Sequence, residues 1–264
     1  MTRIFSALAI LSIVLGVILL LPLLATVLLA DIVALLAFVE YAKLARSAGI
    51  QISSVPACAA TLVTVTTIAL APHALPIVLM TSTVVVAVIA LTEETSEQVL
   101  AQVASTAFAI LYLGLSIGAI AAVQVQFGPK VLMVLLGAVI VSDTAQYYGG
   151  RTIGRRLLAP SISPKKTIEG AVCGVVASAA ALFSFGGSVM PGLGSGWHAL
   201  FGVVIALLGI AGDLFESRLK RASDLKDSSA LIPGHGGVLD RIDGLLFAAP
   251  VYYVVMSVLV RASS

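Results

Sequence analysis

Long apolar stretches separated by short polar segments constrain the fold of this chain more than any other feature. A helix needs about 20 apolar residues to cross the hydrocarbon core of a membrane, and nine stretches of that kind can be read along the chain. Only 11% of the residues are charged, against about 25% in a typical soluble domain. We therefore predict an all-α, polytopic integral membrane protein with about nine transmembrane helices. These are expected near residues 4–22, 23–42, 55–71, 74–92, 100–123, 130–148, 168–187, 198–215 and 244–260.

The first two stretches are poorly separated. Only Pro22 divides them, and the second contains Asp31 and Glu40, so one long helix with a short one fits the pattern almost as well as two spans. A signal peptide is the weaker interpretation of residues 4–21, because apolar spans follow directly instead of a polar mature domain. We expect residues 4–21 to belong to the first span.

The basic residues are distributed unevenly between the two predicted sides of the membrane. With the N-terminus inside, inner segments hold all of the 15 Lys and Arg residues except Lys130 and Arg261. Cytoplasmic loops carry an excess of Lys and Arg, so the pattern predicts a cytoplasmic N-terminus and an odd number of spans. It also predicts that the polar segments 149–167 and 216–243 share the cytoplasmic face.

The segment VSDTAQYYGGRTIGRRLLAPSISPKKTIEG joins an acidic residue to a basic loop. Asp143 falls near the inner end of the sixth stretch, with Gln146 and Tyr147 on the same helical face three and four residues later. The loop 151–166 contains five basic residues and no acidic one. A glycine-rich cationic loop that leads into a helix N-terminus is suited to binding phosphate. Ordinary topology-setting charges beside lipid headgroups are the alternative. We prefer that alternative for Arg155 and Arg156, and the phosphate interpretation for Lys166.

A second group of polar residues lies between the last two stretches. Asp213 and Ser217 are four residues apart on one predicted helix, and Asp240 and Asp243 are three apart on another, so each pair can direct its oxygens toward one point. Carboxylate and hydroxyl oxygens suit Mg²⁺, which usually shares its coordination with water and substrate phosphates. The spacing therefore predicts a magnesium site for a polyphosphate ligand.

The competing interpretation is a charge-neutral network in which these aspartates pair with Lys220, Arg221 and Arg241. Carboxylates at a membrane edge are more often functional, which favours the metal site. His235 lies among glycines in GHGG; loop packing and a phosphate or proton-handling role fit it about equally, and no second His or Cys stands at ligand spacing. Three further charged residues are interpreted as solvent-exposed loop residues: Glu216, Arg218 and Asp224.

These motifs resemble those of the CDP-diacylglycerol synthases, the phosphatidate cytidylyltransferases. The resemblance is carried by SRLKRASDLKDSSALIPGHGGVLDRID, from Ser217 to Asp243, which follows the family signature throughout. The upstream DT…GR…G and SPKKT.EG elements and R-x-x-S-A-L at the N-terminus also resemble the family. Gln146 in DTAQY departs from the pattern, where a small residue is usual.

The resemblance implies transfer of CMP from CTP to phosphatidic acid, which yields CDP-diacylglycerol and pyrophosphate. It implies Mg²⁺ with K⁺ as a second cation, and a homodimer in the cytoplasmic (inner) membrane whose active site opens to the cytoplasm and to lipid. Residues 1–264 would form a single membrane-embedded catalytic domain, with N-terminal helices in 1–95 and the site in 96–264. The candidate residues are the metal ligands Asp213, Asp240, Asp243 and Ser217, the catalytic residues Asp143 and Lys226 together with those three aspartates, and the substrate-binding residues Lys165, Lys166, Ser217, Lys220, Arg221, His235 and Arg241.

Two other functions are compatible with parts of the pattern. A secondary transporter also has many spans and intramembrane acids, but it tends to place them near the midplane, whereas these acids gather at one predicted face. A CTP-dependent polyprenol or lipid kinase would need the same nucleotide and metal, and the signature from Ser217 to Asp243 argues against it. A net charge of +2 does not indicate a nucleic-acid partner.

Overall fold

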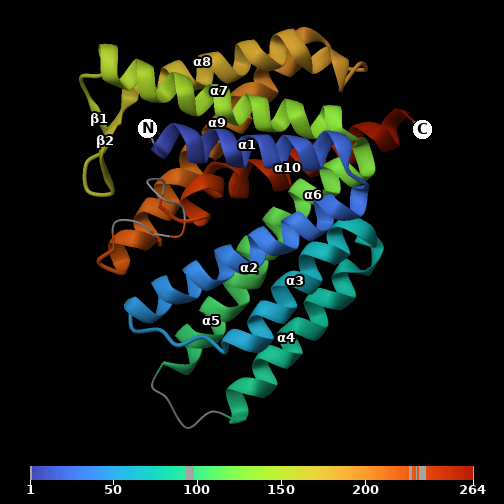
Figure 1. Cartoon of the computed structure of the whole chain (residues 1–264), viewed down its shortest axis with the longest axis vertical. Helices are drawn as coiled ribbons and strands as arrows, with labels where there is room; N and C mark the ends of the chain where they lie inside the picture. The colour runs from blue at the N-terminus through green and yellow to red at the C-terminus, as the bar shows by residue number, and fades with distance from the viewer. Residues whose placement is uncertain (1, 93–97, 226–227, 230, 232–235, 264) are drawn as a thin grey trace. The chain divides into compact units, whose positions relative to one another are not determined.

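The structure is a computed structural model that describes residues 2–92, 98–225, 228–229, 231 and 236–263. Helices form most of it, together with one two-stranded sheet (Figure 1). In chain order the elements are α1 (Thr2–Leu20), α2 (Leu23–Ser47), α3 (Ser54–Leu70), η1 (Pro72–Ala74), α4 (Leu75–Thr92), α5 (Val99–Ala109), the π-helical η2 (Ile110–Leu115), α6 (Ser116–Phe127), α7 (Pro129–Ile153), β1 (Leu157–Ala159), β2 (Ser163–Thr167), α8 (Ile168–Phe185), η3 (Gly186–Ser188), α9 (Ser195–Ala222) and α10 (Leu239–Ser263).

Seven helical segments among the described residues are long and apolar enough to cross a membrane. Two shorter apolar helices, Leu11–Leu20 and Ser54–Leu70, accompany them. Each apolar stretch predicted from the sequence coincides with one helical segment, so the class of an all-α, polytopic membrane protein is confirmed. The number of crossings and the orientation stay predictions. The seven segments are Leu23–Ser47, Pro72–Leu91, Val99–Phe127, Pro129–Ile153, Ile168–Ser188, Ser195–Ala222 and Leu239–Arg261.

The first two apolar stretches form two separate helices. α1 ends at Leu20 and α2 begins at Leu23, with Pro22 as its N-cap. Proline has no N–H to donate and its ring is incompatible with a helix interior, so it interrupts the first helix and is tolerated where the next begins.

The chain divides into two compact units, which are described separately. Unit 1 comprises Met1–Gln126 and Leu219–Ile242, and unit 2 comprises Phe127–Arg218 and Asp243–Ser264. α9 and α10 therefore contribute residues to both. In unit 1 the segment of η2 and α6 packs against α3 at two glycines: a Cβ on Gly114 would touch Thr64, and one on Gly118 would overlap the side chain of Ile68. Small residues at such positions allow helix backbones to approach closely.

In unit 2, α7 and α8 run side by side (Figure 1). Their contact depends on glycines, because a Cβ on Gly149 would overlap Cys173 and one on Gly170 would overlap the carbonyl oxygen of Gln146. α10 is tied to α7 through the buried Tyr252, whose hydroxyl donates to the Val131 carbonyl at 3.0 Å. β1 and β2 form a short antiparallel hairpin between α7 and α8, so the basic segment 149–167 is more ordered than the loop that its sequence predicted.

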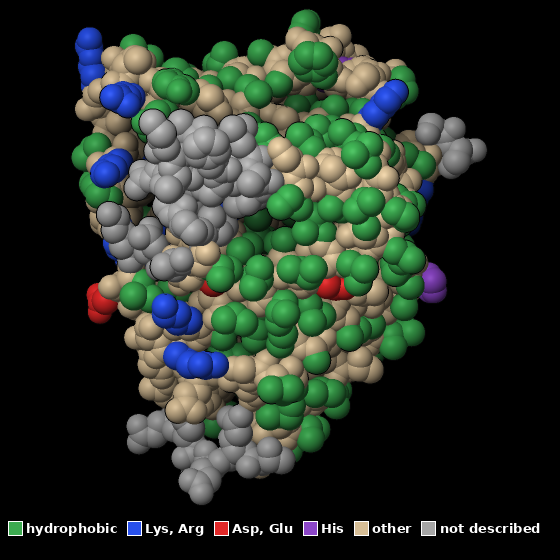
Figure 2. Space-filling view, in the orientation of Figure 1, with side chains coloured by type: hydrophobic (Ala, Val, Ile, Leu, Met, Phe, Trp, Pro, Cys, Tyr) green, Lys and Arg blue, Asp and Glu red, His purple; other side chains and the backbone are tan. Residues whose placement is uncertain are grey.

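The helices expose apolar side chains over much of their surface. Leu28 on α2, Val84 on α4 and Val176 on α8 are each more than 60% exposed. Figure 2 shows hydrophobic side chains spread across the face in view, with few charged groups among them. A helix that is apolar on its outer side is suited to contact lipid rather than water.

Candidate active site

The hairpin places Lys166 beside Asp213 in unit 2. Successive side chains of a strand point to opposite faces, and accordingly Lys165 is exposed to solvent while the Lys166 side chain is only 20% exposed. The Lys166 ammonium group forms an ion pair with the carboxylate of Asp213 on α9. The strand geometry thus separates two adjacent lysines that both stood among the predicted substrate-binding residues.

Polar contacts at the start of α8 hold the hairpin in place. Thr167 is the N-cap of α8, and its Oγ1 accepts a hydrogen bond from the Gly170 N–H at 3.2 Å. The Glu169 carboxylate accepts the N–H groups of Arg155 at 2.9 Å and Arg156 at 3.1 Å. Side-chain capping by Thr167 satisfies a backbone donor that the first turn of the helix leaves unpaired. The Glu169 contacts join the residues directly before β1 to the same helix.

Two more carboxylates surround the ion pair. Asp143 on α7 and Asp243 on α10 lie close enough to each other, to Asp213 and to Lys166 for their charges to interact. α9 and α10 approach closely at this level, and they can do so because Gly212 has no side chain. A Cβ there would overlap the carbonyl oxygen of Asp243. We call these four residues, Asp143, Lys166, Asp213 and Asp243, the unit 2 cluster.

Two polar side chains contact the unit 2 cluster. Gln146, the residue that departs from the family pattern, donates from Nε2 to Asp143 Oδ1 at 3.1 Å and lies over Gly174 of α8, which has no side chain to obstruct it. Ser217 donates to Asp213 Oδ1 at 3.5 Å, one helical turn along α9. Both contacts agree with the helical spacing inferred from the sequence.

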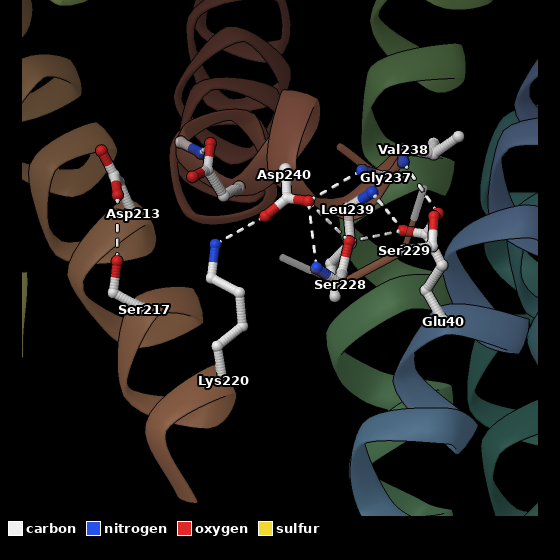
Figure 3. A network of polar contacts seen from close by, with 12 residues as sticks. Glu40, Asp213, Ser217, Lys220, Ser228, Ser229, Gly237, Val238, Leu239 and Asp240 are labelled. Carbon is white, nitrogen blue, oxygen red and sulfur yellow. Dashed lines mark hydrogen bonds and ion pairs between the residues drawn. The ribbon is translucent and has the colours of Figure 1, made fainter. Parts of the chain in front are cut away.

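Asp240 belongs to a different set of contacts, in unit 1 (Figure 3). Its Oδ1 forms an ion pair with Lys220 at 2.5 Å. Its Oδ2 accepts hydrogen bonds from the Ser228 hydroxyl at 2.8 Å, from the Ser228 N–H at 3.1 Å and from the Gly237 N–H at 2.8 Å. The pairing with Lys220 matches one part of the charge network that was the alternative to a metal site.

Glu40 on α2, which was not predicted from the sequence as a candidate, belongs to the same set of contacts. Its carboxylate is buried and accepts four hydrogen bonds from residues near the start of α10 (Figure 3). The donors are the hydroxyls of Ser228 at 3.0 Å and Ser229 at 2.6 Å and the N–H groups of Val238 at 2.9 Å and Leu239 at 2.8 Å. A carboxylate within a predicted span was the available signal, but nothing in the local spacing connected it with residues almost 200 positions away.

The remaining predicted residues fall into three groups. Lys226 and His235 lie outside the described residues. Arg221 and Arg241 are exposed, as are Arg218 and Asp224, which were expected to be. The expectation that Glu216 is exposed was wrong: it is fully buried, because α9 continues to Ala222 and places it one turn after the buried Gly212.

The donor chemistry of the unit 2 cluster fits a magnesium ion. Carboxylate oxygens are the ligands that Mg²⁺ prefers, and three like charges gathered around one ammonium group favour an additional cation. Within the described part of the chain, however, no group of three or more His, Cys, Asp or Glu residues is arranged to hold a metal ion. The cluster therefore contains oxygen ligands of the type that Mg²⁺ prefers, but the described residues do not form a metal site by themselves.

The fold and these contacts define a helical, multi-pass membrane protein with an acidic cluster and a lysine at its polar segments. The chain belongs to the cytidylyltransferase family, whose model matches residues 1–259.

Curated relatives include phosphatidate cytidylyltransferases. The chain is 43% identical to the enzyme of that name from Helicobacter pylori (strain ATCC 700392 / 26695) over 139 residues, which cover 53% of this chain and 52% of the relative. It is 34% identical to the one from Thermotoga maritima over 174 residues, or 64% of each chain. An uncharacterized protein from Escherichia coli (strain K12), YnbB, is 41% identical over 130 residues, covering 49% of this chain and 43% of the relative. The chain thus spans between 43% and 64% of the length of these relatives.

Proposed function

We propose that this protein transfers CMP from CTP to phosphatidic acid and releases pyrophosphate. The observation that carries the proposal is the unit 2 cluster, in which Lys166 lies beside Asp213, Asp143 and Asp243 at the polar end of apolar helices. A cationic group for phosphate and a set of carboxylates for a divalent cation are what a nucleotide-dependent lipid enzyme requires. Membership of the cytidylyltransferase family and relatives named phosphatidate cytidylyltransferase support the choice of nucleotide and lipid.

The reaction itself is a phosphoryl-type displacement. An oxygen of the lipid phosphate attacks the α-phosphorus of CTP, the bond between that phosphorus and its bridging oxygen to the β-phosphate breaks, and pyrophosphate leaves with the bonding electrons. Such reactions need positioning and charge stabilisation more than covalent chemistry from the protein. Lys166 would bind a phosphate oxygen of CTP by a charge-assisted hydrogen bond, exchanging its partner Asp213 for the substrate.

The aspartates would serve as ligands of a divalent cation. Asp213 and Asp243 are proposed from the unit 2 cluster, and Asp240 and Ser217 from the signature that contains them. A bound Mg²⁺ would neutralise the triphosphate and polarise the reacting phosphorus. Asp143, held by Gln146, is proposed to tune the charge around Asp213. Lys226, His235, Lys220, Arg221 and Arg241 stay candidate phosphate-binding residues on the signature alone.

The setting follows from the nature of the substrates. CTP is aqueous and phosphatidic acid is a lipid, so the reaction must occur at the level of the headgroups. We propose that the polar segments face the cytoplasm at the inner membrane, on the basis of the distribution of Lys and Arg. K⁺ as a second cation and a homodimer are proposed from the resemblance to CDP-diacylglycerol synthases.

The test is an assay of the purified full chain with Mg²⁺, CTP and phosphatidic acid. CTP labelled at the α-phosphorus should transfer its label to the lipid, and CTP labelled at the γ-phosphorus should not. Transfer of the γ-label to a polyprenol or another lipid would instead identify a CTP-dependent kinase. Failure of both labels to reach any lipid would overturn the enzymatic proposal and leave a transporter as the competing function.

A further inference from the structure

Glu40 is bound by four donors that come from the two ends of one polar segment. Ser228 and Ser229 donate from one end, and the N–H groups of Val238 and Leu239 donate from the other. The Glu40 side chain lies on α2 and is 3% exposed. Burying a carboxylate is unfavourable unless hydrogen bonds replace its water, and these donors replace it here.

Two of the donors are backbone groups at the start of a helix. α10 begins at Leu239, and the first N–H groups of a helix have no partner within it. A carboxylate at this position also interacts favourably with the positive end of the helix dipole. Glu40 therefore caps α10 from a residue 199 positions away in sequence.

The same contacts extend to Asp240. The Ser228 hydroxyl lies between the two carboxylates, 3.0 Å from Glu40 Oε2 and 2.8 Å from Asp240 Oδ2, and can donate its one proton to only one of them at a time. Gly237 leaves room for this arrangement, because a Cβ there would overlap the Ser228 hydroxyl and the Glu40 carboxylate. Asp240 in turn holds Lys220. Figure 3 shows the contacts converging on the segment before α10.

We propose that Glu40 is a positioning residue for the CMP transfer described above, an inference that rests on that proposed function. Its carboxylate joins Ser228 and Ser229 to the first turn of α10 and so orients Asp240 and its ion pair with Lys220. Glu40 touches neither substrate; it acts through the residues that it binds. A carboxylate on the N-terminal helix α2 thereby fixes the positions of Ser228, Ser229 and the first turn of α10.

The variants Glu40→Gln and Ser229→Ala test this role in the full chain. Glutamine keeps the length of the side chain but presents an NH₂ group to donors. Backbone hydrogen exchange at Val238 and Leu239 should become about tenfold faster or more in Glu40→Gln, since hydrogen bonds to a charged group are among the stronger ones. The kcat for CMP transfer should fall about tenfold or more, while exchange in α3 and α4 stays unchanged.

A double-mutant cycle separates positioning from a general loss of folded protein. Ser229→Ala alone should lower kcat by about two- to fivefold. In the Glu40→Gln background it should lower kcat no further, because the contact between Ser229 and the Glu40 carboxylate is already lost. Asp31→Asn is the matched control: it alters another carboxylate of α2, one that accepts a hydrogen bond from Thr66 on α3 at 3.0 Å. It should leave both kcat and the exchange of Val238 and Leu239 unchanged.

The outcomes are distinguishable from one another. Unchanged exchange at Val238 and Leu239 in Glu40→Gln, or additive effects in the cycle, would overturn the positioning role. A kcat that falls only in proportion to the folded fraction, with exchange rising across all of unit 1, would overturn it as well. A wild-type chain that transfers no CMP would overturn the proposed function and Glu40's part in it, while the exchange data would still decide whether Glu40 anchors α10.

Discussion

Adjacent residues in this protein can have different roles because of the local backbone. Lys165 and Lys166 are neighbours in the SPKKT motif, but the strand directs one to solvent and the other to Asp213. The same holds for Glu216 and Ser217 on α9, where the first is fully buried and the second contacts Asp213. Residue type alone therefore does not identify the groups that can reach a substrate.

Lys166→Ala should weaken the use of CTP far more than Lys165→Ala. A charge-assisted contact to phosphate contributes about 1.5–3 kcal/mol, so kcat/KM for CTP should fall about 10- to 150-fold in Lys166→Ala. An exposed lysine contributes little, and Lys165→Ala and Arg156→Ala should stay within about twofold of wild type. Steady-state kinetics with varied CTP measures this. Equal, small losses of kcat/KM in all three variants would mean that Lys166 only helps to set the membrane orientation and does not bind CTP.

Asp→Asn substitutions should distinguish the three aspartates proposed as metal ligands by their contacts. Asp213→Asn and Asp243→Asn remove anionic ligands, and we expect turnover to fall by orders of magnitude in protein that still inserts and purifies. Asp213→Asn also weakens the single ion pair with Lys166. Asp240→Asn also weakens the ion pair with Lys220 and the contacts of Ser228 and Gly237, so its free energy of unfolding should fall by about 1–3 kcal/mol as well.

Thermal stability and the rate of CMP transfer, measured across a Mg²⁺ titration, distinguish these effects. Asp224→Asn is the control, because Asp224 is exposed and has a positive φ of 54°, a conformation that asparagine adopts at least as well. Near-normal turnover of Asp213→Asn at ordinary Mg²⁺ would refute the assignment of that residue as a metal ligand.

At the scale of elements, glycines decide how closely the site-bearing helices approach. α7 and α8 meet through Gly149 and Gly170, and α9 meets α10 at Gly212, next to Asp213. Small residues matter more in a membrane protein, since helices there associate by close packing rather than by a hydrophobic driving force. The positions of the acidic side chains therefore depend on these glycines, which have no side chain of their own.

Gly212→Ala should disturb the unit 2 cluster, whereas Gly209→Ala should not. A Cβ on Gly212 would overlap the Asp243 carbonyl, and forcing extra volume into such a contact costs about 1–3 kcal/mol. Gly209 lies one turn earlier on α9 with open space around the position of a Cβ, and alanine there should raise stability by up to about 1 kcal/mol through helix propensity. Thermal unfolding and CMP-transfer rates of both variants measure the difference. A Gly212→Ala protein as stable and active as wild type would show that the helices do not need this approach.

At the scale of the whole molecule, the proposal requires the basic hairpin to face the cytoplasm. α8 follows the hairpin directly and is long and apolar enough to cross a membrane. Ser161 in the hairpin turn and Ser195 at the start of α9 flank it, and both are exposed. The two positions should therefore lie on opposite sides of the membrane.

Single cysteines at these positions test the orientation. In a background with Cys58 and Cys173 replaced by alanine, Ser161→Cys should be protected from a membrane-impermeant thiol reagent in intact cells, and Ser195→Cys should react. Permeabilised cells provide the control, in which both positions should be labelled. Labelling of Ser161→Cys from outside would reverse the predicted orientation and move the proposed site away from cytoplasmic CTP.

The sequence by itself determined the features that depend on local pattern. Hydropathy over about 20 residues located the long apolar helices of the described residues, and the motif from Ser217 to Asp243 pointed to the family that the chain belongs to. Helical spacing also placed Gln146 on the same helix face as Asp143, and Ser217 on that of Asp213, and each pair is hydrogen-bonded in the structure.

Only the tertiary structure decided which distant groups meet. Asp143 and Asp243 share a cluster with Asp213, whereas Asp240 joins Lys220 and the segment bound by Glu40. The burial of Glu216 followed from a helix that continues beyond its apolar stretch. These contacts depend on the packing of helices separated by up to 199 residues, and residue spacing carries information about neighbours only along one helix or strand.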